Sequence, residues 1–212
     1  MSALLFSLVF CLGMLSMGLQ LVASRVLAPF FGTSIFVWAS LITTFLAAFS
    51  TGSFIGGVIS GTPSTTQRKT MATVMSIGSA ALIFNSLACY AVCDWLDLRI
   101  ENLPAKLITT CLLLYFVPIT ALSTITPVSV AYYNRHGKSA GRAAGLLTGV
   151  STLGNIAGVL VAALVLIPTF GVHNLLHLWW ISSVCIQLPL WFVLYSRSAQ
   201  SQPPSSAIVL DK

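Results

Sequence analysis

Acidic side chains are scarce in this sequence: only 4 of its 212 residues are Asp or Glu, and charged residues of both signs make up 7% of the chain. A soluble domain carries about 25% charged residues, whereas 57% of this chain is hydrophobic and its mean hydropathy is +0.94. This composition excludes soluble enzymes, nucleic-acid-binding modules and disordered chains. It predicts an all-α bundle that crosses a lipid bilayer several times, with no nucleic-acid partner.

Motifs for catalysis, cofactors and metals are also missing. The sequence has no glycine-rich phosphate loop, no dinucleotide fingerprint and no Ser/His/Asp set with an acid in reach. Cys89 and Cys93 lie one helical turn apart, so a disulfide or a metal site stays open, although small apolar core residues are the favoured interpretation. His173 and His177 have the spacing of a metal-binding pair but lack an evident third ligand. We predict no metal, no cofactor and no catalytic residue.

Six intervals almost free of charge are long enough to cross the hydrocarbon core, which takes about 20 apolar residues. Pro118 and Pro127 interrupt the fourth of them. Residues 94–104 hold three of the four acids and are expected to form a loop. We predict a transmembrane domain over residues 1–197 and a disordered cytoplasmic tail over residues 198–212. The predicted spans are residues 1–32, 35–60, 71–93, 106–133, 142–167 and 175–195.

The basic residues between the spans indicate the orientation, because loops rich in Lys and Arg stay in the cytoplasm. Alternating spans place six basic residues on one side and three on the other. We therefore expect both termini in the cytoplasm and the protein in a bacterial cytoplasmic (inner) membrane. Four tryptophans then lie toward the outer interface as an aromatic belt: Trp38, Trp95, Trp179 and Trp180. The basic residues on the cytoplasmic side are Arg68, Lys69, Arg135, Lys138, Arg142 and Arg197. Those on the outer side are Arg25, Arg99 and Lys106.

Glycines recur at four-residue spacing in two of the predicted spans. Small residues let helix backbones approach closely inside a bilayer, where no hydrophobic force holds helices together. We expect these positions to pack helices within one chain, with a dimer face or a sliding transport interface as the alternatives. They are Gly52 and Gly56 in the second span, and Gly145, Gly149, Gly154 and Gly158 in the fifth.

Polar side chains at membrane depth are the candidates for a ligand site. Gln20, Asn85, Asn155 and Gln187 should face protein or water, because an unpaired amide in hydrocarbon costs several kcal/mol. They would line a cavity or form interhelical hydrogen bonds. Arg25 either extends to the headgroups or holds a carbonyl cluster or an anionic group. No Asp or Glu lies inside a predicted span.

Several segments resemble the membrane domain of bacterial spermidine-synthase-like proteins, described as fused transporter-superfamily/spermidine synthases. They are residues 21–32 (LVASRVLAPFFG), 52–57 (GSFIGG), 118–127, 141–154 and 166–171 (LIPTFG). The resemblance places Arg25 inside its most specific motif. Gln20 stands where the family usually has a Glu, so a role for that carboxylate does not carry over. The aminopropyltransferase-like domain that the family often appends is not in this sequence, so we expect no spermidine synthesis from this chain alone.

Two functions follow as hypotheses. The first is a transporter-like permeation module for a small molecule, which the resemblance, the prolines of the fourth span and the intramembrane amides favour. A polyamine or another small molecule would be its ligand. The second is a non-catalytic scaffold or anchor that recruits or regulates a separately encoded synthase-like or other membrane partner. In both cases we expect a homo-oligomer or a subunit of a membrane complex.

Overall fold

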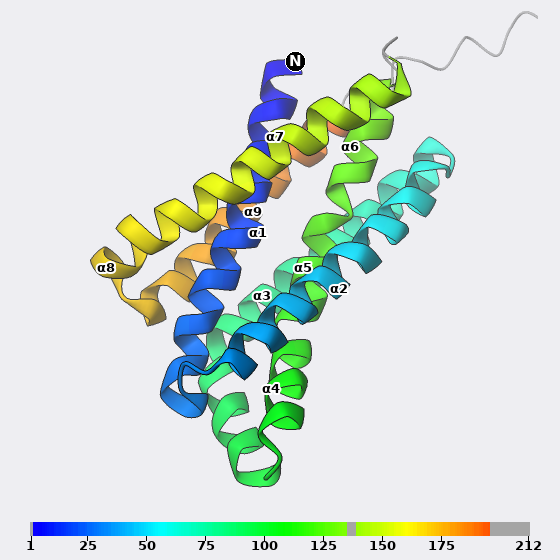
Figure 1. Ribbon diagram of the computed structural model, residues 1–212. Helices are drawn as coiled ribbons and strands as arrows, with labels where there is room; N and C mark the ends of the chain where they lie inside the picture. Colours follow the sequence, from blue (N-terminus) through cyan, green and yellow to red (C-terminus); the bar gives the residue numbers. More distant parts are fainter. Residues whose placement is uncertain (1, 135–138, 196–212) are drawn as a thin grey trace, which may run out of the picture.

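The computed structural model describes residues 2–134 and 139–195, and every regular element within these ranges is helical. Figure 1 shows the helices running up and down the molecule, with short turns at both ends. The predicted tail and the basic residues 135, 138 and 197 lie outside the described residues. The elements are α1 (Ser2–Phe31), α2 (Ile35–Ser60), α3 (Ser64–Arg99), α4 (Leu103–Cys111), η1 (Leu112–Phe116), α5 (Val117–Ser123), α6 (Ile125–Asn134), α7 (Ala140–Val161), η2 (Ala162–Leu166), α8 (Ile167–Phe170) and α9 (Val172–Tyr195).

Five stretches of helix are long and apolar enough to cross a membrane: 3–31, 35–60, 65–99, 103–134 and 140–170. The fourth combines α4, η1, α5 and α6, and the fifth combines α7, η2 and α8. The prediction of an all-α chain is therefore confirmed for the described residues, and these five stretches fit the predicted multi-pass membrane protein by their length and composition. The sixth stretch, α9, has 24 residues, and its role as a sixth span stays a prediction.

The third helix is longer than the sequence suggested. The predicted loop over residues 94–104 is wrong for most of its length, because α3 continues to Arg99 and only residues 100–102 separate it from α4. Charged residues do not end a helix that extends beyond the bilayer into water. Asp97 pairs with Lys106 of α4 at 2.6 Å, and Asn102 accepts a hydrogen bond from the backbone N–H of Ala105, as a helix N-cap does.

Prolines shape the fourth and fifth stretches. Each contains a five-residue π-helix, η1 or η2, which ends two residues before Pro118 or Pro168. Proline has no N–H to donate to the carbonyl four residues earlier, and a π-turn is one way in which a helix accommodates this loss. A turn at Thr124, three residues before Pro127, then separates α5 from α6.

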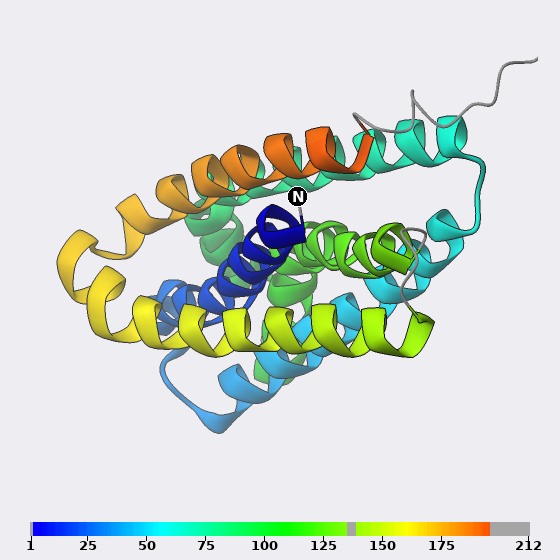
Figure 2. The same ribbon diagram turned by 90° about the horizontal axis from the view of Figure 1, so that it is seen from above.

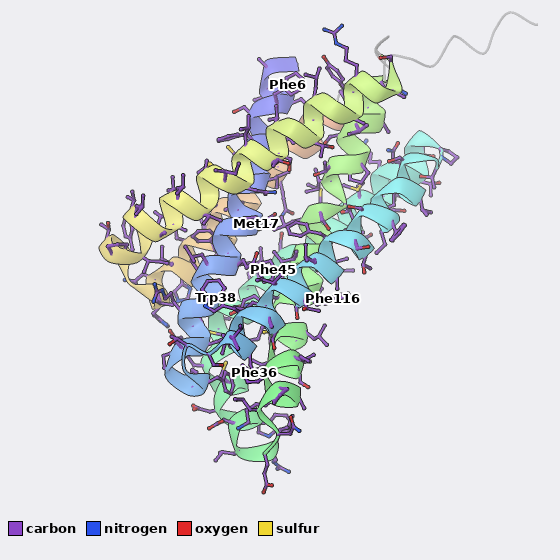
Figure 3. All side chains as sticks on the ribbon, in the orientation of Figure 1. Phe6, Met17, Phe36, Trp38, Phe45 and Phe116 are labelled. Carbon is purple, nitrogen blue, oxygen red and sulfur yellow. The ribbon has the colours of Figure 1, made fainter. Side chains whose placement is uncertain are left out.

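Helix α1 lies at the centre of the bundle. Seen from above, it lies between α7 on one side and α9 on the other, and it contacts both (Figure 2). Helices α2 and α3 pack against the broken fourth stretch. Helix α7 lies at the front of Figure 1, and its stretch is the least buried of the five apolar ones. At the lower end of α2, Phe36 and Trp38 are exposed, as expected for lipid- or interface-facing side chains (Figure 3).

Candidate functional site

A small polar cavity lies between α1, α2, the junction of α5 with α6, and α7. Its volume is about 180 Å³. It is the candidate functional site because its wall is mostly hydroxyl and amide groups, although every helix around it is predominantly apolar. The polar lining residues are Ser16, Ser53, Ser123, Thr126, Thr148, Ser151, Thr152 and Asn155.

Glycines bring α1 and α7 together beside this cavity. A side chain on Gly154 would overlap the backbone of Phe10, and one on Gly158 would overlap the backbone of Met14. From the other helix, Gly13 lies against the carbonyl of Ser151. The two backbones therefore touch along this contact, and Ser151 and Asn155 of α7 are half-buried beside the cavity.

On the opposite wall, α2 packs against the interrupted fourth stretch. Gly52 leaves room for the side chain of Ser123, and Gly56 leaves room for the carbonyl of Thr124. The Ser123 hydroxyl donates to the carbonyls of Ala48 on α2, at 3.3 Å, and of Thr120 in its own helix, at 3.0 Å. This wall thus includes the turn at which α5 gives way to α6.

The hydrogen bonds of the lining residues show which groups remain available. Ser16 donates to the carbonyl of Leu12 and Thr152 to that of Thr148, both at 2.9 Å, so these donors are used within their own helices. The hydroxyl oxygens still have lone pairs to accept with. The Asn155 side chain forms no hydrogen bond to any residue that the structure describes. The cavity therefore offers neutral donors and acceptors, and none of its lining residues is charged.

The other predicted candidates do not converge on this cavity. Asn85 is buried between α3 and η1, where its Nδ2 donates to the carbonyl of Leu114 at 2.9 Å. In a regular α-helix, the N–H of residue 118 would donate to that carbonyl, but residue 118 is proline. Asn85 replaces the missing donor, which is a structural role.

Gln187 lies in a separate groove between α3 and α9. Its Oε1 accepts from Ser79 at 3.3 Å and its Nε2 donates to Ser183 at 2.6 Å. Gln20 is half-buried on α1, and Arg25 is exposed one turn beyond it. Neither lines the polar cavity, and within the described ranges neither has a hydrogen-bond or ion-pair partner.

The glycines of α7 divide into two groups. Gly154 and Gly158 pack against α1, whereas a side chain on Gly145 or Gly149 would meet nothing within 4 Å in the described part of the chain. Gly145 and Gly149 therefore lie on the open face of α7. The five-residue step from Gly149 to Gly154 puts the two pairs on different faces of the helix, but periodicity alone does not indicate which face packs against α1.

One tryptophan of the predicted aromatic belt lies inside the bundle, whereas Trp38 and Trp95 are exposed as expected. Trp179 is 5% exposed and donates from Nε1 to the carbonyl of Leu15 at 2.8 Å, so it packs inside the bundle. On the same helix, Nδ1 of His177 lies 2.7 Å from the Ser86 hydroxyl. The ring centroids of His173 and His177 are 5.2 Å apart. Among the described residues, no three His, Cys, Asp or Glu side chains form a group that could hold a metal.

The hydroxyl residues of the cavity are the functional candidates that sequence reasoning missed. A signal was present: Thr148, Ser151, Thr152 and Asn155 have the spacing i, i+3, i+4, i+7, which is one face of a helix. Single Ser and Thr residues are common in membrane helices, where they bond to their own backbone. Three hydroxyl residues and the Asn155 amide on one helix face together indicate a polar surface, which no single Ser or Thr does.

Comparison with known proteins adds no family to this description: no protein-family model, no curated protein and no solved structure matches the chain.

Proposed function

We propose that this protein is a transporter-like permeation module for a small polar molecule, and that the cavity beside Asn155 is its binding site. The observation that supports the proposal is the Asn155 amide, which has no hydrogen-bond partner in residues 2–134 and 139–195 and lies in a hydroxyl-lined cavity at membrane depth. Unsatisfied polar groups are costly in hydrocarbon, so such a wall is retained where water or a polar ligand meets it. In this proposal α9 is the sixth span and both termini face the cytoplasm of a bacterium.

The shape of the cavity wall supports movement of a solute. The wall includes the turn between α5 and α6, and helix breaks at membrane depth are tolerated where they line a water-filled cavity. Interrupted helices near the bilayer midplane also form the binding sites of many transporters. Gly52 and Gly56 leave the broken segment room to lie directly on α2.

The chemistry of the lining favours a small neutral solute. Ligand pockets usually measure about 300–1,000 Å³, and this cavity is smaller, at about 180 Å³. A polyamine, the ligand class that the resemblance suggests, would meet hydroxyls and an amide but no carboxylate there. A compact polyol or amide matches the donors and acceptors better than a long cation does.

Solute flux tests this function. Proteoliposomes containing the full chain should shrink and re-swell in gradients of glycerol or urea at least fivefold faster than empty liposomes. Asn155→Leu should remove most of that excess, because it replaces the amide that lines the cavity with an apolar side chain. The matched control is Ile156→Leu, next in sequence but 54% exposed on the outside of α7, and it should leave the flux unchanged. Wild-type flux equal to that of empty liposomes, for solutes of this size, would contradict the proposal.

A second candidate function, the membrane scaffold, is favoured by the open face of α7. Gly145 and Gly149 on that face are suited to close contact with another helix. Purification of the full chain in mild detergent should then yield a stoichiometric partner or a homo-oligomer that Gly149→Leu removes. A monodisperse single chain in both proteins would argue against this function and leave the transport proposal intact.

A further inference from the structure

A groove between α3 and α9 is chemically different from the proposed transport cavity. The two helices lie side by side (Figure 2) and leave a space of about 400 Å³ between them. Its wall is mainly apolar, and Leu188 at its edge is 65% exposed. The apolar lining residues are Ala72, Met75, Val184 and Leu188.

Two cations lie at the end of α3 from which this groove begins. Arg68 precedes Ala72 by four residues, so the two share a face of the helix. Lys69 is adjacent, and both basic residues are exposed. The nearest acid on α3, Asp94, is 26 residues further along, which is about 39 Å at 1.5 Å per residue. Two basic side chains therefore stand at the mouth of the groove.

Polar groups inside the groove are arranged in two ways. Ser79 and Gln187 bond to each other across the two helices, so these partners satisfy one another. The Ser76 hydroxyl also lines the groove, is exposed, and has no hydrogen-bond partner among the described residues. It lies two turns below Arg68 and remains available as a donor.

We propose that this groove binds one anionic phospholipid, with its phosphate at Arg68 and Lys69 and an acyl chain along the apolar wall, past Ser76. The argument is charge complementarity combined with depth: cations lie at the mouth, and the apolar residues Ala72 and Met75 follow along α3, with the Ser76 hydroxyl beside them. Basic pockets between membrane helices recognise anionic headgroups in this way. The proposal does not depend on the transport function, since the polar cavity and this groove share no lining residue.

The test is native mass spectrometry of the full chain, titrated with phosphatidylglycerol and phosphatidylcholine that carry the same acyl chains. The wild-type protein should retain one phosphatidylglycerol in clear preference to phosphatidylcholine. Arg68→Gln should lower the affinity for phosphatidylglycerol about fivefold, and adding Lys69→Gln about fivefold again, with phosphatidylcholine unchanged. Arg99→Gln, a change of the same charge at the opposite end of α3, should have no effect.

A second pair of variants separates a groove from mere surface attraction. Ala72→Phe fills the groove and should lower phosphatidylglycerol binding at least fivefold. Thr73→Phe adds the same bulk on the next residue, which is exposed and does not line the groove, and should bind as the wild type does. Equal binding of the two lipids by the wild type, or equal binding by the Ala72 and Thr73 variants, would overturn the proposal. Binding of free glycerol phosphate as tightly as the lipid would overturn it as well.

Discussion

At the scale of single residues, the polar side chains of this bundle have different roles. Asn85 corrects a backbone defect, because its amide supplies the hydrogen bond that Pro118 cannot donate to Leu114. The Asn155 amide lies beside a cavity and has no hydrogen-bond partner in the part of the chain that the structure describes. The sequence predicted that both amides face protein or water. It could not predict their different partners, since Asn85 and Leu114 are 29 residues apart.

The role of Asn85 predicts a specific coupling. Asn85→Leu should destabilise the folded protein by about 1–3 kcal/mol, because it leaves the buried Leu114 carbonyl without a donor. Pro118→Ala restores a backbone N–H four residues after that carbonyl. In the Pro118→Ala background, Asn85→Leu should therefore cost markedly less. The measurement is a double-mutant cycle of unfolding free energies in mixed micelles. Equal costs of Asn85→Leu in the two backgrounds would show that the amide does not replace the missing N–H.

At the scale of helices, the positions of most elements could be predicted from apolar length. The range 35–60 agrees with α2 residue for residue, and the stops near residues 32 and 171 are both glycines with positive φ, +72° and +70°. The prediction for α3 is too short because it assigns the charged residues 94–104 to a loop. In the structure, Asp97 of α3 and Lys106 of α4 form an ion pair between two helices. Charge marks the edge of the membrane rather than the end of a helix.

The glycines of α7 give a matched pair for testing helix packing. Gly154→Leu should destabilise the protein by about 1–3 kcal/mol or prevent its assembly, because the new side chain would overlap the backbone of Phe10 on α1. Gly149→Leu introduces the same residue where no atom of the described residues lies within 4 Å, and it should leave the folded chain intact. Detergent chromatography and thermal unfolding of both variants provide the readout. Equal sensitivity of the two positions would mean that the α1–α7 contact is not the one described.

At the scale of the whole molecule, the site depends on four elements that meet only in the fold. The sequence identified Asn155 as a candidate, but the partners that turn it into a cavity come from α1, α2 and the α5–α6 junction. The meeting of these elements at one cavity results from tertiary packing, which the residue pattern of a single helix does not predict. Gln20, Arg25, Asn85 and Gln187 were equally polar in sequence and lie elsewhere in the structure.

Orientation is the second property of the whole molecule to test. The turn at residues 61–63 lies at the same end as the N-terminus, and the turn at residues 100–102 lies at the opposite end (Figure 1). A reporter active only outside the cytoplasm should be silent when inserted after Thr62 and active when inserted after Glu101, because basic loops stay inside. Insertion at these two turns leaves helix α3 uninterrupted. Activity at Thr62 with silence at Glu101 would reverse the proposed topology.

The most direct measurement of the central claim is the water accessibility of the polar cavity. Ser151→Cys and Leu153→Cys lie on the same helix, the first lining the cavity and the second 60% exposed on its outer surface. Both should be introduced into a chain whose five native cysteines are replaced by serine or alanine, in sealed membrane vesicles. A small charged thiol reagent reacts with the thiolate, which forms in water and not in hydrocarbon. Reaction at position 151 at least tenfold faster than at position 153 is the predicted result, and equal rates at the two positions would contradict a water-filled binding site.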